Sequence, residues 1–238
     1  MAEHEPAEAA RYVRALAGIG MQPITDMIAF VEALGVVVIR RDFGTDAQDG
    51  VSLSPPSRRP VMVINTSLPG DRQRMSVGHE LGHLVLHGWQ VASGEDSVEQ
   101  EAFAFAGELI APQGVMQQRL VGLTDRAWRR LLTVKDEFGI SISAQIEQGR
   151  RLGVIDDTLY RTLRIKLNSL GWTKIEPGTV PEEHPHLMNQ VVDAHLDRLG
   201  RRLDEVASTA LMLPDPFVRH YVTHRSDVGA IRPGGSQR

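Results

Sequence analysis

The 238-residue sequence has no cysteine, only 5% aromatic residues and no long apolar run. The lack of cysteine excludes both a disulfide framework and a thiolate metal site, so a zinc ion would have to be held by histidine and carboxylate side chains. No apolar stretch reaches the roughly 18 residues of a membrane-spanning helix, and the N-terminal stretch lacks the apolar core of a secretory signal. We therefore expect a cytoplasmic protein that does not associate with membranes.

An excess of positive charge is also missing. The formal net charge is -4 at pH 7, which argues against a protein that coats nucleic acid. A hydrophobic fraction of 42% is typical of a globular protein, and the length suits one sizeable domain with appendages or two small domains.

The first part of the chain mixes helix and strand patterns. Helical periodicity occurs over residues 6–17, 24–34, 71–87 and 97–110. Short runs of apolar residues predict strands of a small mixed sheet at 35–40, 51–53 and 61–64. We expect an α+β domain over residues 1–115.

After Pro112 the strand patterns end. Helices are expected at about 125–138, 143–152, 156–170, 187–199, 203–210 and 215–221. The stretch Thr173 to Pro185 contains three prolines and resembles a linker. We therefore predict an all-helical, helix-turn-helix-like region at 116–175, a C-terminal helical region at 176–231 and a disordered tail at 232–238.

The helix predicted over residues 71–87 contains the sequence His79-Glu80-Leu81-Gly82-His83, which matches the H-E-x-x-H pattern. Residues four apart lie on one face of a helix, so His79 and His83 can bind one metal ion. Glu80 lies about 100° around the helix from His79 and can approach a water molecule on that ion. The pattern predicts a metal site with a general base beside it.

A catalytic zinc ion needs a third protein ligand. His87 is not suitable, because it lies about 12 Å along a continuous helix from His79. The next predicted helix offers Glu99, Glu101 and Glu108. We predict Glu101 as the third ligand, with Glu108, two turns later on the same face, as the leading alternative.

Two linked segments resemble the ImmA/IrrE family of zinc metallopeptidases. The first runs from Arg72 to His87 and the second from Glu99 to Pro112, and the strand ending Val63-Ile64-Asn65 is also similar to that family. The resemblance implies that His79, His83 and Glu101 bind zinc and that Glu80 is the general base. Phe103 and Ala111 differ from the residues usual in the family, and we expect neither of them to touch the ligands.

The resemblance implies an intracellular zinc metallopeptidase that cleaves a helix-turn-helix transcriptional repressor or antitoxin and so relieves repression of stress or mobile-element genes. In this chemistry Glu80 takes a proton from a metal-bound water and passes it to the leaving amine. The alternative is a non-proteolytic regulator with a structural or vestigial zinc site, which binds DNA or a partner protein through its helical half. The intact Glu80 favours the peptidase, because a structural metal site needs no base.

The substrate-binding groups are less well defined by the sequence. Val61 to Ile64 could be an exposed edge strand that pairs with an extended substrate, or an ordinary strand within the sheet. Candidates for stabilising the oxyanion are Tyr160, His184, His186, Tyr221 and His224, although each is more simply explained as a surface or packing residue.

Residues Trp128 to Ile155 have the spacing of a helix-turn-helix, with Gly139 at the turn. Arg150 and Arg151 on the second helix could contact DNA. The favoured alternative is a packing motif used for repressor docking or dimerisation, because the arginines are sparse and the chain is net acidic. We accordingly expect a protein partner, with DNA binding as the less favoured hypothesis and no membrane partner.

Overall fold

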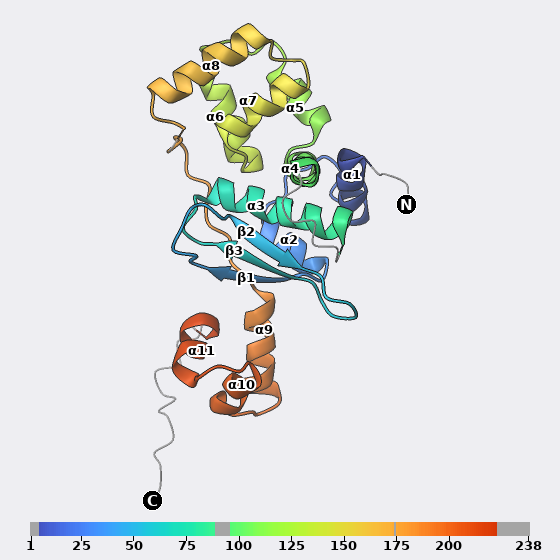
Figure 1. Cartoon of the computed structure of the whole chain (residues 1–238), viewed down its shortest axis with the longest axis vertical. Coiled ribbons are helices and arrows are strands. Elements are labelled where there is room, and N and C mark those ends of the chain that lie inside the picture. Colours follow the sequence, from blue (N-terminus) through green and yellow to red (C-terminus); the bar gives the residue numbers. More distant parts are fainter. Residues whose placement is uncertain (1–4, 89–95, 174, 223–238) are drawn as a thin grey trace, which may run out of the picture. The chain divides into compact units, whose positions relative to one another are not determined.

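The structure of the chain is a computed structural model that describes residues 5–88, 96–173 and 175–222. The chain divides into two compact units, Met1–His184 and Pro185–Arg238. Within the described ranges, no helix combines the length and apolarity needed to cross a membrane. The expected α+β class is confirmed, since unit 1 combines a small sheet with helices (Figure 1).

Three short strands form the sheet of unit 1. They are β1 (Val37–Arg41), β2 (Gly50–Leu53) and β3 (Val61–Asn65), in the order β1-β3-β2. β3 pairs in parallel with β1 and antiparallel with β2. One face of the sheet carries the fully buried Val38, Met62 and Ile64 and is covered by helices, as strand alternation requires.

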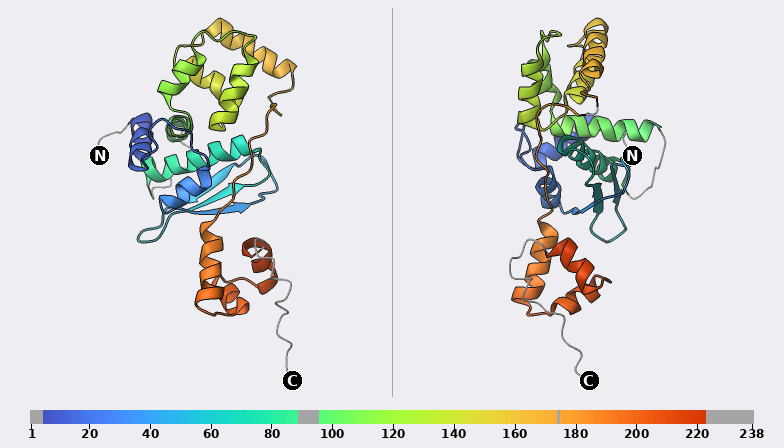
Figure 2. Two further views of the ribbon diagram at one scale, coloured as in Figure 1. Left: turned by 180° about the vertical axis from the view of Figure 1, so that it is seen from behind. Right: turned by 90° about the vertical axis from the view of Figure 1, so that its left-hand side faces the viewer.

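The helices on that face are α2 (Met27–Ala33) and α3 (Gly70–Gly82), and α3 continues into a π-helical turn, η1 (His83–His87). α4 (Asp96–Ile110) packs on α3, and α1 (Pro6–Leu16) packs on α4 (Figure 2). The contact of α3 with α4 is close because two glycines face two alanines. A Cβ added to Gly78 would lie 3.2 Å from the Cβ of Ala106, and one added to Gly82 would lie 3.1 Å from the Cα of Ala102.

Four more helices complete unit 1: α5 (Gln113–Leu120), α6 (Trp128–Phe138), α7 (Ile142–Arg151) and α8 (Asp157–Ser169). α6, α7 and α8 lie within a few residues of their predicted positions, and Gly139 forms the turn between α6 and α7 in the left-handed conformation, with a φ of 66°. α5 was not predicted. Its buried apolar positions, Met116 and Leu120, are too few to give a clear period.

The boundary predicted at residues 115/116 falls inside unit 1. Buried residues on both sides of it, such as Leu109, Leu131 and Ile146, belong to one hydrophobic core. The helical region therefore shares its core with the sheet-containing part and is not a separate domain.

The predicted linker is bound to unit 1 through its acidic residues. Glu176 accepts hydrogen bonds from the backbone N–H groups of Ile142 and Ser143, at 2.7 and 2.9 Å, at the start of α7. Glu183 accepts from the backbone N–H groups at the start of α2 and forms an ion pair with Arg74. Unit 1 accordingly extends to His184, past residue 175, where the helix-turn-helix-like region is expected to end.

Unit 2 is a small helical cluster. It contains α9 (Leu187–Asp193), the π-helical turn η2 (Ala194–Arg198), α10 (Leu203–Thr209) and α11 (Pro214–Tyr221), close to the predicted helices. Its core is formed by Val192, Ala207, Phe217 and Val222, together with Val206. The predicted disordered tail, 232–238, lies outside the described residues.

Candidate active site

The H-E-x-x-H residues lie near the C-terminal end of α3, between the sheet and α4. His79 and Glu80 are 9% and 7% exposed, although both are polar. Buried polar side chains need partners, so the groups around them indicate what they do.

His79 and His83 point toward one another, and Glu99 joins them from α4. The two Nε2 atoms are 2.9 Å apart. The Glu99 carboxylate lies 3.1 Å from His79 Nε2 and 3.6 Å from His83 Nε2. One atom of each of the three side chains lies within 4.8 Å of the others, an arrangement that could hold a metal ion.

Glu101, the predicted third ligand, is not part of this cluster. Its carboxylate lies 3.1 Å from His87 Nε2. Glu99 and Glu101 are two residues apart, which places them about 200° apart around α4, so they cannot face the same way. Glu99 therefore replaces Glu101 as the candidate third ligand.

The other candidates also lie elsewhere. Glu108, the alternative ligand, is buried at the far end of α4, where it accepts a hydrogen bond from the backbone N–H of Gln113 at 2.9 Å and pairs with Arg11. His87 lies outside the three-donor cluster, as its distance along the helix predicts, and contacts His83 instead.

Glu80 faces the sheet, where Ser52 of β2 holds its carboxylate. The Ser52 hydroxyl donates to Glu80 Oε2 at 2.7 Å. Ser52 points toward α3 because it lies opposite the buried Met62 in the β2–β3 register, on the covered face of the sheet. Gly50, two residues earlier on the same face, leaves space for Glu80, since a Cβ there would lie 3.2 Å from Glu80 Cγ.

These groups lie at a cleft of about 700 Å³. Its walls are β2 with the residues that follow it, the end of α3, and Glu99 and Phe103 of α4. Buried Asn65 shapes the loop before β2, because its amide group donates to the carbonyl oxygens of Thr45 and Gln48. The cleft is open to solvent and is lined by the metal-binding candidates, Glu80 and apolar side chains.

Part of the chain matches a known family. Residues 31–146 match the peptidase family whose conserved region is described as the IrrE N-terminal-like domain. This match, over a little under half of the chain, supports the resemblance to the ImmA/IrrE family. Comparison with curated protein sequences gives no significant match. The IrrE N-terminal-like domain extends beyond α4 to the middle of α7, in agreement with the shared core of unit 1.

Burial shifts the pKa values at the site of the IrrE N-terminal-like domain. It lowers the pKa of His79, as does the neighbouring His83, and it also lowers the pKa of His83. Neutral histidine is the form that binds metal. Burial raises the pKa of Glu80, and the Ser52 hydrogen bond partly opposes that shift. A carboxylate with a raised pKa is better suited to accept a proton.

The interpretation of Val61 to Ile64 as an edge strand is wrong. These residues belong to β3, which lies between β1 and β2 and pairs with both. In the part of the chain that the structure describes, β2 is an edge of the sheet, and it is also the strand that lines the cleft.

Two of the oxyanion candidates, Tyr160 and His184, do not line the cleft. Tyr160 donates to Glu147 at 2.6 Å, and His184 lies 2.7 Å from an Arg40 nitrogen. His186 and Tyr221 belong to unit 2, and His224 lies outside the described residues. Surface or packing roles describe Tyr160 and His184 better.

Three residues of the site were not chosen from the sequence as part of it, although Glu99 was named among the possible ligands. Glu99 and Phe103, four residues apart on α4, share one face, and the Phe103 ring lies against His79 with a centroid distance of 4.2 Å. The expectation that Phe103 does not touch the ligands is therefore wrong. Ser52 is the third, and no local pattern marks it because its role depends on the strand register.

Proposed function

We propose that the chain is a zinc-dependent endopeptidase. The observation that carries the proposal is the arrangement around Glu80, a carboxylate held by Ser52 beside the His79, His83 and Glu99 cluster at an open cleft. A structural metal site has no use for a base beside it, and structural zinc sites are usually closed by a fourth protein ligand. The IrrE N-terminal-like match supports a peptidase.

The donor set fits zinc. Two imidazole nitrogens and a carboxylate are a known ligand set of catalytic zinc sites, which leave a further position open. The two Nε2 atoms, 2.9 Å apart and both beside Glu99, are close enough to share one ion after small adjustments. When bound, zinc supplies Lewis acidity, which polarises a peptide carbonyl and brings the pKa of a water molecule to about 7.

Residues of the chain would transfer the proton and bind the substrate. Glu80 takes the proton of the attacking water and delivers it to the amine that leaves. The edge of β2 offers backbone N–H and C=O groups to an extended peptide, which would place its peptide bond next to Glu80. Ser52 keeps the Glu80 carboxylate oriented through both steps.

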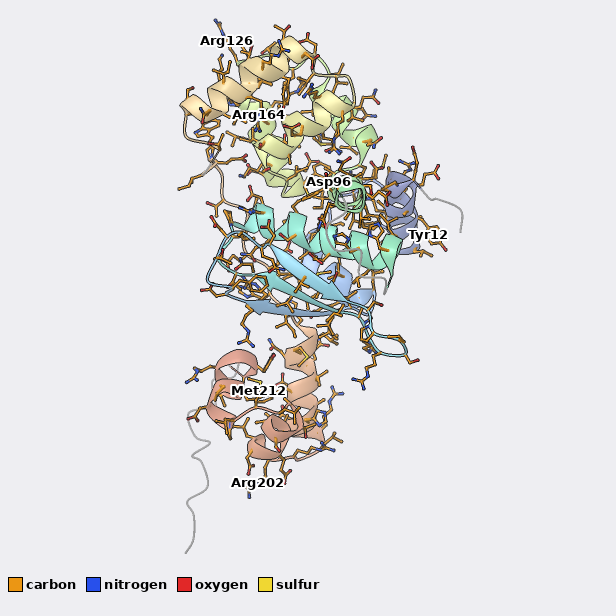
Figure 3. The ribbon with its side chains drawn as sticks, viewed as in Figure 1. Tyr12, Asp96, Arg126, Arg164, Arg202 and Met212 are labelled. Carbon is orange, nitrogen blue, oxygen red and sulfur yellow. The ribbon has the colours of Figure 1, made fainter. Side chains whose placement is uncertain are left out.

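For the substrate we propose a helix-turn-helix transcriptional repressor or antitoxin, docked through the helical part of unit 1. DNA is the weaker hypothesis. Arg150 is engaged within the chain, since it donates to Asp157 at 3.0 Å and lies over the Tyr160 ring at 4.4 Å. Arg126 and Arg164 project from the same helical part (Figure 3), but Arg164 also pairs within it, donating to the Ser143 hydroxyl at 2.7 Å.

The test is incubation with a helix-turn-helix regulator from the same organism. The wild type should cleave it in a reaction that a chelator stops. Glu80→Gln should retain zinc and lose at least about a hundredfold in rate, because the amide cannot accept the proton. Glu8→Gln, an exposed change on α1, is the matched control and should cleave normally.

Two results would contradict the proposal. Cleavage by Glu80→Gln at the wild-type rate would remove Glu80 from the chemistry. Zinc binding without cleavage of this regulator or of unfolded protein by the wild type would favour the alternative, a non-proteolytic regulator.

A further inference from the structure

His83 has a second hydrogen-bond partner, on the side away from the proposed metal site. Its Nε2 faces His79 and Glu99, whereas its Nδ1 lies 3.1 Å from Nδ1 of His87. His87 in turn places Nε2 3.1 Å from the Glu101 carboxylate. A continuous chain of polar contacts therefore runs from Glu101 through His87 to His83.

The backbone of η1 brings the rings together. In this π-helical turn the N–H of Gly88 donates to the carbonyl oxygen of His83 at 3.1 Å, five residues back. The wider turn changes the angle between positions 83 and 87, and the two ring centroids lie 5.3 Å apart. π-helical turns within α-helices are frequent at functional sites.

The chemistry of the groups determines where the protons lie. An ionised carboxylate only accepts hydrogen bonds, so His87 must carry its proton on Nε2 to pair with Glu101. A neutral His87 then accepts at Nδ1, and His83 must donate from its own Nδ1. This tautomer leaves the lone pair of His83 on Nε2, which faces His79 and Glu99.

We propose that His87 and Glu101 are positioning residues that hold His83 in the tautomer and orientation needed to bind zinc. The inference rests on the proposed metal site and extends it beyond the ligands. It also gives Glu101 a role different from the predicted one. Among the described residues, His79 Nδ1 has no comparable partner, so the support acts on His83.

Removal of the His87 side chain should weaken zinc binding more than removal of the Glu101 side chain. The His87 side chain is 12% exposed, whereas the Glu101 side chain is 49% exposed. Loss of a partner behind a metal-binding histidine weakens metal affinity by about 10- to 100-fold. We expect that range for His87→Ala and only a several-fold loss for Glu101→Ala, because exposed pairs are weaker.

The experiment measures the zinc dissociation constant by competition with a chelator. The variants are His87→Ala, Glu101→Ala, the double variant of both, and Glu99→Ala; the control is Gln100→Ala, an exposed neighbour on α4. The chain of contacts predicts that Glu101→Ala adds nothing once His87 is alanine, since Glu101 acts through His87. Additive losses, or an unchanged affinity in His87→Ala, would overturn the proposal.

Failure of the ligand assignment would look different. If Glu99 were not a ligand, Glu99→Ala would bind zinc with wild-type affinity. Glu101→Ala would then lose as much zinc affinity as the removal of a ligand is expected to cost. Nitrogen NMR of the zinc-loaded wild type gives a readout that does not depend on any variant folding. It should show one proton on His83 Nδ1 and one on His87 Nε2. A His87 that carries its proton on Nδ1 and not on Nε2 would also overturn the proposal.

Discussion

Glu80 lies on a largely buried helix and has a partner from a distant part of the chain. It is buried, and its carboxylate accepts a hydrogen bond from a serine 28 residues earlier in the chain. Burial favours proton uptake, while the Ser52 hydroxyl fixes the direction from which the proton must come. At the residue scale, the site therefore includes Ser52 as well as the H-E-x-x-H residues.

Ser52→Ala should lower kcat by about tenfold with little change in KM, because a hydrogen bond to a charged group contributes about 1.5 kcal/mol or more. The loss would be in orientation of the base rather than in substrate binding. Steady-state cleavage of the regulator measures both constants, and Ser52→Thr, which keeps the hydroxyl, should restore most of the rate. An alanine variant with wild-type kcat would show that Glu80 needs no such support.

Spacing within one helix can be predicted from the sequence. His79, Glu80 and His83 are related by α-helical spacing alone, and the structure brings the two histidines together as that spacing predicts. The choice between Glu99 and Glu101 depends on how α4 is rotated against α3. That rotation is set by the contact of Gly78 and Gly82 with two alanines, which is a tertiary feature.

At the scale of elements, Lys135 joins α6 to α3 and to the segment after α8. Its side chain is only 3% exposed, and its ammonium group donates to Asp71 Oδ2 at 2.7 Å and to Glu176 Oε2 at 2.9 Å. Burial alone would lower the pKa of Lys135, but the two carboxylates raise it above its usual value. The group therefore stabilises the folded state in its charged form.

Lys135→Met should lower the free energy of unfolding by about 3 kcal/mol near neutral pH, because it leaves two mostly buried carboxylates without their cation. Urea unfolding measures the difference, and Lys166→Met, which removes a half-exposed ion pair, should cost less than about 1 kcal/mol.

The pH dependence of that difference follows from the raised pKa. The contribution of Lys135 is complete below the unfolded value of 10.5 and declines as pH rises through the higher folded value. The stability gap between wild type and Lys135→Met should therefore be constant up to about pH 10 and narrow above it. A gap that is absent, or that widens at alkaline pH, would contradict this account.

Long helices and the α+β class were predictable because their periodic patterns are local. The strand order was not, since β3 is central only through its pairing with β1 on one side and β2 on the other. No sequence pattern predicts the π-helical turn η1, although this turn brings His87 into contact with His83. Helix α5 was missed for the related reason that few of its residues are buried.

At the scale of the whole molecule, the chain joins a compact unit that contains the candidate site to a smaller helical unit. The helical part after α4 shares the core of the site-bearing unit, so a substrate docked there would contact the same unit that carries Glu80. The acidic residues of the predicted linker could not be recognised as part of this unit from composition, because their partners, such as Lys135 and Arg74, lie far away in sequence.

The central claim is that His79, His83 and Glu99 form the metal site. Crystals of the full chain grown with zinc, measured at the zinc absorption edge, test it most directly. The account predicts one strong anomalous peak at about 2.0–2.2 Å from Nε2 of both histidines and from a Glu99 oxygen. A peak coordinated by Glu101 in place of Glu99, or no peak at the two histidines, would contradict it.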